Sequence, residues 1–290
     1  MINGIINVYK EEGYTSFDVV AKLRGITKIR KIGHTGTLDP DATGVLPVCI
    51  GSATKLVDML TDKTKEYIAD MKLGIVTDTQ DISGTVIKTN EVNITTGKFR
   101  DAILSFKGRI KQIPPMYSAL KVDGRKLCDM ARAGIEVERK PRDIEISDID
   151  ILDIDDISAR IRVTCSKGTY IRTLCNDIGE KLGCGAVMTK LVRTRSGDFK
   201  LEDAYKLSQI EEMAKEGELE KIVTPVDKVF ECYEAVTVTG ENEKRVLNGN
   251  MIDLNRKDEF LRIYLENRRF AAVYTFDRAK ACHVPFKMFL

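Results

Sequence analysis

Residues 143–159 alternate isoleucine with acidic side chains. Isoleucine stands at positions 144, 146, 149, 151 and 154, and seven acids without a single base fill much of the remainder. A period close to two is that of a strand with one buried face and one solvated face. The stretch therefore predicts a half-buried strand whose outer face is negative.

Short strand and helix patterns are interleaved along the rest of the first 200 residues. Strands are predicted at residues 4–8, 67–75, 85–87 and 160–164, and helices at 96–106, 124–133 and 175–182. A further helix begins after the capping pair Thr15 and Ser16, and its predicted apolar face comprises Phe17, Val20, Ala21 and Leu23 or Ile26. This mixed order favours an α+β fold over a doubly wound parallel sheet.

The last quarter of the chain has a different pattern. Residues 201–223 are polar and amphipathic, which is typical of a helix, and they end at Thr224-Pro225. Short β patterns follow at residues 235–239, 260–264 and 270–276, around Gly240 and Gly249. We therefore expect a first domain of residues 1–226 and a small all-β domain of residues 227–290.

Composition excludes several classes of protein. The 290 residues carry 46 Lys+Arg against 44 Asp+Glu, a net charge of +2, with 43% hydrophobic and 31% charged residues. These values are those of an ordinary globular chain and not of a disordered or fibrous one. No stretch approaches the roughly 18 apolar residues of a spanning helix, so a cytoplasmic location is the default expectation.

The seven cysteines are scattered and odd in number, which does not fit a disulfide framework. A metal site is not predicted either, because there is no Cys-x-x-Cys pair and the two histidines, His34 and His283, lie far apart. We expect the cysteines to be buried or half-buried free thiols.

The near-zero net charge hides strong local imbalances. Residues 22–31 hold five bases and no acid, residues 101–142 hold ten bases against five acids, and residues 160–200 hold nine against three. A solvated face would explain any one of these clusters. Three clusters balanced by one segregated acidic stretch favour a basic surface for a polyanion.

Residues 33–47 are the segment best suited to carry chemistry. They contain three glycines, two prolines, two acids and a histidine, and Pro40 directly follows Asp39. Pro40 stiffens the backbone, so the Asp39 carboxylate would be presented from a constrained loop. The alternative is a connecting loop in which aspartate is a turn former. The spacing matches neither a phosphate-binding P-loop nor a dinucleotide-binding turn.

Residues 33–47 closely resemble the catalytic motif of the TruB family of bacterial tRNA pseudouridine synthases, which isomerise uridine 55 in the T loop of tRNA. Four further stretches resemble the family in the same order, at residues 3–10, 65–81, 112–121 and 165–173. The resemblance implies the pseudouridine-synthase fold, which is a central mixed, mainly antiparallel sheet flanked by helices. It also implies a small PUA-like RNA-binding domain at the C-terminus.

The resemblance assigns roles to individual residues. It implies that the Asp39 carboxylate is catalytic and that Arg172 is its partner. Tyr67 would stack on the target base and take part in proton transfer. The remaining candidates are the pocket residues Tyr170 and Leu191, His34 as support for the flipped nucleotide, and Lys10 near the active site. Taken singly, Arg172 could instead bind phosphate, and Tyr67 and Leu191 could be core residues.

Three residues depart from the family pattern. Asp41 stands where leucine is usual, Glu11 replaces a proline that often follows Lys10, and Cys128 stands where an aromatic is common. The negative charge of Asp41 would raise the pKa of Asp39 unless Arg172 or solvent compensates.

The isomerisation needs no oxidant and no external energy, so neither cofactor nor metal is expected. The implied partner is the T-stem loop of tRNA, with no membrane, no obligate protein partner and a monomeric state. One alternative is a non-catalytic RNA-binding or tRNA-folding protein on the same fold. A glycoside hydrolase using Asp39 and Asp41 is a second alternative, and a guide-RNA-dependent synthase is a third.

Overall fold

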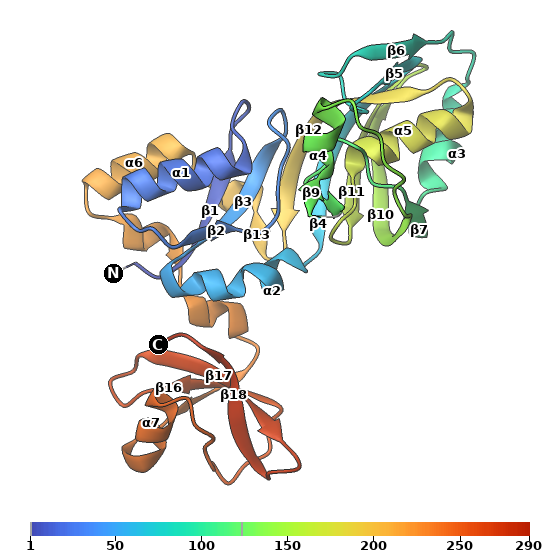
Figure 1. The fold of residues 1–290 in the computed structure, drawn as a ribbon. Helices are drawn as coiled ribbons and strands as arrows, with labels where there is room; N and C mark the ends of the chain where they lie inside the picture. The colour runs from blue at the N-terminus through green and yellow to red at the C-terminus, as the bar shows by residue number, and fades with distance from the viewer. Residues whose placement is uncertain (1, 123) are drawn as a thin grey trace.

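The computed structural model describes residues 2–122 and 124–290. A large sheet forms its centre, with strands in the order β14-β1-β3-β12-β4-β11-β10-β7 and with β2 and β13 paired to β3 and β12 (Figure 1). The strands are β1 (Gly4–Lys10), β2 (Ile32–His34), β3 (Thr43–Ile50), β4 (Lys65–Leu73), β7 (Gly108–Gln112), β10 (Arg142–Ile154), β11 (Ser158–Cys165), β12 (Ala186–Ser196), β13 (Phe199–Lys200) and β14 (Val223–Thr224). Within this sheet, β3 and β12 are the only described strand pair that runs parallel. The predicted mixed, mainly antiparallel sheet is confirmed.

Helices cover the two halves of this sheet. They are α1 (Ser16–Thr27), α2 (Val57–Thr61), α3 (Thr96–Leu104), α4 (Leu127–Arg132), α5 (Ile171–Leu182) and α6 (Leu207–Lys215), with the 3-10 turns η1 (Gly51–Leu56), η2 (Leu201–Asp203), η3 (Leu219–Ile222) and η4 (Val226–Phe230). Helices α1 and α6 pack on β1 and β3 through one apolar cluster. Helices α3 and α5 pack on β4, β10, β11 and β12 through another. Two small hairpins, β5 (Ile75–Thr77) with β6 (Val86–Thr89) and β8 (Lys121–Val122) with β9 (Arg125–Lys126), project from this body.

The alternating segment forms β10, a turn and the start of β11. Its isoleucines are spaced by two, three, two and three residues, and the pairing with β11 shifts register after Ile146 and again after Ile151. Each bulge adds one residue, which returns the next isoleucine to the buried face. The apolar face of the strand is therefore maintained although the spacing departs from two.

Helix α1 begins where the capping signal predicted. The Thr15 side chain accepts a hydrogen bond from the backbone N–H of Asp18, and the Asp18 side chain accepts one from the Thr15 backbone. Its predicted apolar face is partly wrong, because Phe17 and Ala21 are exposed whereas Val19 is buried. The buried stripe is set by packing on the sheet, to which the helix turns positions 16, 19, 20 and 23.

The C-terminal part folds on a four-stranded sheet, β15 (Glu234–Thr237), β16 (Phe260–Tyr264), β17 (Phe270–Asp277) and β18 (Cys282–Met288). The expected small C-terminal β domain is confirmed, but it is not all β, because helix α7 (Gly240–Leu247) packs on this sheet. Phe230 joins Val273 and Phe289 to an apolar cluster that also includes Leu56 and Leu60 of the larger body. The small sheet therefore lies against η1 and α2, as Figure 1 shows.

Three further expectations need correction. The helical stretch predicted at residues 201–223 is helical only in α6, with 3-10 turns on either side. The helix predicted from residue 124 begins at Leu127, after the short strand β9. Cys232 is exposed, whereas the other six cysteines are buried or half-buried. Within the described ranges, no helix is long and apolar enough to cross a membrane.

Candidate active site

Asp39 lies in the loop of residues 35–42 between β2 and β3, which we call the aspartate loop. The Ser16 hydroxyl holds the loop from α1, because it accepts the N–H of Leu38 at 2.9 Å and donates to the Leu38 carbonyl at 3.3 Å. Within the loop, the Ala42 N–H donates to the Asp39 carbonyl at 3.1 Å. The aspartate is thus fixed on a tight turn that α1 supports.

Gly44 is required where the loop enters β3. Its φ is +105°, and a Cβ built there would lie 2.2 Å from the Arg193 carbonyl oxygen. Only glycine permits this approach of β3 to the parallel strand β12, where Gly44 pairs with Arg193. The Gly44 of the sequence motif therefore brings the aspartate loop against β12.

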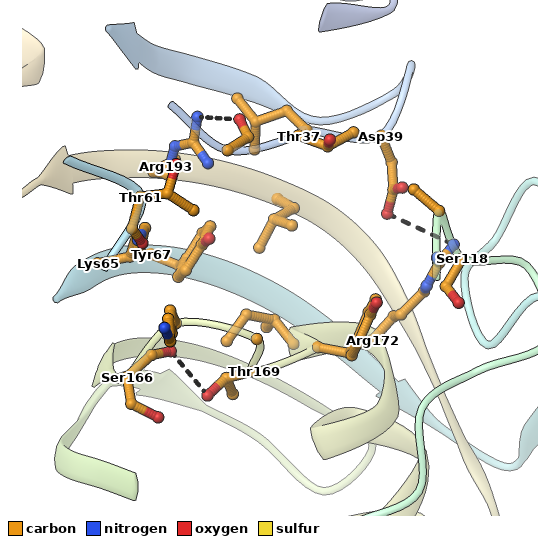
Figure 2. Close-up of a pocket in the computed structure, with 18 of the residues that line it drawn as sticks. Thr37, Asp39, Thr61, Lys65, Tyr67, Ser118, Ser166, Thr169, Arg172 and Arg193 are labelled. Carbon is orange, nitrogen blue, oxygen red and sulfur yellow. Dashed lines mark hydrogen bonds and ion pairs between the residues drawn. The ribbon is translucent and has the colours of Figure 1, made fainter. Parts of the chain in front are cut away.

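Arg172 joins the aspartate to a second carboxylate. Its Nη1 lies 3.4 Å from Asp39 Oδ2 and 3.2 Å from Asp81 Oδ2, and its side chain is only 6% exposed. Its Nη2 donates to the backbone carbonyl of Tyr117. Figure 2 shows Asp39 and Arg172 approaching each other from opposite sides of a hollow. The sequence prediction that these two residues meet agrees with this geometry.

The surroundings of Asp39 oppose its ionisation on balance. Removal of bulk water by the neighbouring protein raises the pKa of the Asp39 carboxyl, and Arg172 lowers it. The charges of Asp81 and Asp41 raise the pKa further, while Lys10 lowers it. The Asp39 pKa therefore lies above its ordinary value, and the expected effect of Asp41 is present but is smaller than that of Asp81.

A cavity of about 290 Å³ opens beside this pair. Its walls come from the aspartate loop, β4, β12, residues 118–120 and the segment 166–172 that leads into α5. Five predicted site residues line it, namely Asp39, Tyr67, Tyr170, Arg172 and Leu191. The volume is close to the lower end of the roughly 300–1,000 Å³ that is usual for small-molecule pockets.

Tyr67 and Leu191 line the inner surface of this cavity, and they lie on the neighbouring strands β4 and β12. Tyr67 of β4 pairs with Arg193 of β12, and Leu191 pairs with Ala69 two residues further along. Tyr67 is 9% exposed and Leu191 is 8% exposed. Burial raises the pKa of the Tyr67 hydroxyl, and the charge and hydrogen bonding of Arg193 oppose that rise.

Arg193 is a site residue that the sequence did not reveal. It is 1% exposed, lines the cavity, and has no carboxylate partner among residues 2–122 and 124–290. Its Nε donates to the Val45 carbonyl at 2.6 Å and its Nη2 to the Gly36 carbonyl at 3.2 Å. Gly36 is near the start of the aspartate loop and Val45 is just after its end, so one buried guanidinium links the two ends of the loop.

Lys10 supports the same loop from outside the cavity. Its side chain is fully buried, and Nζ donates to the carbonyls of Pro40 at 2.9 Å, Tyr14 at 2.5 Å and Glu11 at 3.1 Å. Burial lowers its pKa to about 8 although Asp39 and Asp41 pull the other way. Lys10 thus contacts the residue after Asp39 through the backbone and is not among the described residues that line the cavity.

His34 and Tyr170 lie at two edges of the site. His34 is on β2, outside the described lining of the cavity, and burial lowers its pKa. Its Nδ1 is buried without a hydrogen-bond partner among the described residues. Tyr170 caps α5, and its backbone N–H donates to Gln112 Oε1 at 2.8 Å while Gln112 Nε2 donates back to the Tyr170 carbonyl at 3.0 Å.

Two further residues belong to the site without having been assigned a role. Asp81 was part of a recognised sequence block, but nothing in the sequence indicated that it would meet Arg172. Lys65 lines the cavity and is 5% exposed, and burial lowers its pKa to about 8. Across the described ranges, no group of three or more His, Cys, Asp or Glu is placed to hold a metal ion.

A carboxylate and a guanidinium that face a partly closed cavity, next to a tyrosine, form the kind of site that enzymes use for catalysis. Comparison with known proteins gives the family. Residues 24–171 match the model of the TruB family pseudouridylate synthase N-terminal domain, and residues 172–231 match that of the tRNA pseudouridylate synthase B C-terminal domain.

Curated relatives and a solved structure agree with this match. The tRNA pseudouridine synthase B of Lachnoclostridium phytofermentans is 49% identical over 310 aligned positions, covering 100% of both chains. That of Clostridium acetobutylicum is 48% identical over 275, covering 93% of this chain and 94% of the relative. A structure described as an H/ACA RNP bound to a substrate RNA containing 2′-deoxyuridine has a TM-score of 0.71 at 26% identity, and the match covers 99% of this chain and 85% of that one. The chain belongs to the TruB family of pseudouridylate synthases.

Proposed function

We propose that this protein is an isomerase that converts uridine 55 in the T loop of tRNA to pseudouridine. The observation that carries the proposal is the Asp39–Arg172 pair, 3.4 Å apart, at a cavity whose inner surface includes Tyr67. Family membership at high identity over the whole chain supports the reaction class. The aspartate lies where the family motif predicts a catalytic carboxylate.

The reaction moves a sugar from one atom of a base to another. The bond from N1 of uracil to C1′ of the ribose breaks, the base turns, and a bond from C5 to C1′ forms. The hydrogen on C5 leaves as a proton and N1 ends with one, so product and substrate have the same atoms. A carboxylate suits this chemistry because it can act as a nucleophile or stabilise positive charge on the sugar.

The residues around the cavity divide this work. Asp39 acts in its ionised form, and Arg172 is the cation that makes ionisation possible in a partly dry site. Tyr67 stacks on the uracil and takes part in moving the C5 proton. Leu191 and Tyr170 complete the pocket for the base.

Two residues act from outside the cavity. Lys10 fixes the aspartate loop through the Pro40 carbonyl. His34 supports the flipped nucleotide from β2. Extrusion of the target base takes a few kcal/mol, which stacking and backbone contacts offset.

The rest of the chain serves RNA binding. Residues 1–226 form the catalytic domain, and residues 227–290 form a PUA-like domain that adds contacts to the tRNA. The partner is the T-stem loop, recognised largely through its folded shape. The enzyme works in the cytoplasm as a monomer without an obligate protein partner or a cofactor.

The test uses an unmodified tRNA transcript incubated with purified protein and no added cofactor. Pseudouridine is mapped by carbodiimide labelling and reverse-transcription stops. We expect one new stop at the T-loop uridine with wild type and none with Asp39→Asn, which should still bind tRNA. Appreciable pseudouridine from Asp39→Asn would refute the role of Asp39, and binding without any stop would favour the RNA-folding alternative.

A further inference from the structure

Phe17 is an exposed aromatic side chain on the second residue of α1. The residue is 64% exposed, whereas its neighbours Ser16 and Val19 are buried. An exposed apolar side chain by itself is unremarkable on a protein surface. Its surroundings distinguish this ring from the other exposed apolar residues of the chain.

Phe17 directly follows a residue that holds the aspartate loop. Ser16, the residue before Phe17, exchanges two hydrogen bonds with Leu38, the residue before Asp39. In Figure 1 helix α1 lies over β1 and β3, the strands that carry this end of the site. The start of α1 is therefore fixed to the loop that carries Asp39.

A cation accompanies the ring. The Arg24 guanidinium lies 5.9 Å from the centre of the Phe17 ring, and Arg24 Nε donates to the Arg30 carbonyl at 3.1 Å. The hydrogen bond holds the guanidinium beside the ring. Aromatic rings and arginine planes are the two surfaces on which unpaired bases stack in RNA complexes.

The rest of this surface is positively charged. The exposed bases Lys22, Lys28, Arg30 and Lys31 lie on α1 or just beyond it. Neither these four side chains nor Arg24 forms an ion pair with an acid among the described residues. Asp18, the one acid of the helix, is engaged in the N-terminal cap. A helix that carries one exposed ring, and five such cations along its length and just beyond its end, matches a polyanion that also carries planar bases.

We propose that Phe17 and Arg24 form a stacking platform for an unpaired base of the RNA substrate, close to the nucleotide that enters the cavity. Lys22 and Lys28 neutralise phosphates of the same strand. This inference rests on the proposed function for the identity of the RNA. It assigns to α1 a contact with substrate in addition to its support of the aspartate loop.

The platform is tested by comparing Phe17→Ala with wild type on an unmodified tRNA transcript and on its isolated T arm. Stacking of one base on an aromatic ring predicts a rise of about tenfold in KM, and in the Kd of labelled T-arm RNA, with kcat unchanged. Phe17→Tyr keeps a ring and should bind like wild type. Ile87→Ala on β6 is the matched control, because Ile87 is 66% exposed on a hairpin outside this surface.

The readouts separate this proposal from the proposed function. If wild type makes no pseudouridine, the function fails, while the Kd comparison still tests the platform. If Phe17→Ala binds within twofold of wild type, the platform is refuted and the ring serves another contact, such as one with a protein. Because Phe17 is 64% exposed, the melting temperature of Phe17→Ala should equal that of wild type. A large fall would show that the ring is packed against the protein and would count against the platform.

Discussion

Replacement of Asp81 by asparagine tests whether the second carboxylate orients Arg172. Asparagine has the same shape, and its carbonyl can still accept from the hydroxyls of Thr79 and Ser83, which Asp81 Oδ1 now binds at 2.7 and 2.6 Å. In the wild type, Asp81 Oδ2 lies 3.2 Å from Arg172 Nη1 and accepts from it. In the variant the asparagine NH2 group would take the place of Oδ2, so a donor would face the Arg172 donor. The change removes one charged interaction and leaves the turn intact.

The expected loss of activity depends on the partners that Arg172 keeps in the variant. The guanidinium keeps Asp39 and the Tyr117 carbonyl, so the loss is that of one charge-assisted hydrogen bond, about 1.5–3 kcal/mol. If this interaction sets the Arg172 position during reaction, kcat should fall about ten- to hundredfold. KM for tRNA should change little, because Asp81 is 15% exposed beneath the surface that RNA would contact.

The pH profile of Asp81→Asn gives an independent readout. The Asp81 charge raises the pKa of Asp39, so its removal should lower that pKa and shift the acidic limb of kcat/KM to lower pH. Steady-state pseudouridine formation in the tRNA transcript is measured between about pH 5 and 9. Asp78→Asn is the control, because Asp78 lies in the same turn and accepts from the Thr85 N–H without touching Arg172. Unchanged kcat in Asp81→Asn, or an equal loss in Asp78→Asn, would refute the reasoning.

Two other substitutions probe the support of the aspartate loop. Lys10→Met keeps the length of the side chain but removes the donor to the Pro40 carbonyl, so kcat should fall at least about tenfold. Because burial lowers the Lys10 pKa to about 8, the wild-type kcat/KM should decline above that pH as the ammonium loses its charge. If the same decline persists in Lys10→Met, it belongs to another group. Gly44→Ala places a Cβ 2.2 Å from the Arg193 carbonyl at a φ of +105°, so unfolding free energy should fall by about 2–4 kcal/mol in thermal melts. Gly25→Ala, with nothing within 4 Å, should be neutral or slightly stabilising, and equal effects at both glycines would contradict the close approach.

The extent of the aspartate loop shows what local rules could and could not predict. Residues 33–47 were interpreted as one loop because glycine and proline interrupt regular structure. In the structure the loop covers only residues 35–42, and β3 starts at Thr43 and includes both Gly44 and Pro47. Gly44 is in a strand because β12 approaches it there, and that reason lies about 150 residues away in the sequence.

The candidate site was predictable only where a motif named a residue. Asp39, Tyr67 and Arg172 follow from sequence blocks of the family, and they line one cavity. Arg193 has no such signal, since an arginine in a basic stretch is ordinarily expected at the surface. Its role depends on carbonyls at Gly36 and Val45 that only the folded chain brings to it.

The electrostatics of the loop explain why three nearby cations do not keep the Asp39 pKa low. Lys10 and Arg193 direct their donors to backbone carbonyls, so they hold the position of the chain and pair with no carboxylate in the described ranges. Among the described residues, Arg172 is the one cation that forms an ion pair with the Asp39 carboxylate, and it shares its Nη1 with Asp81. Burial therefore outweighs Arg172, and the Asp39 pKa is raised. A carboxylate with a raised pKa is a stronger base and nucleophile once ionised, which is what breaking and remaking a bond at C1′ requires of it.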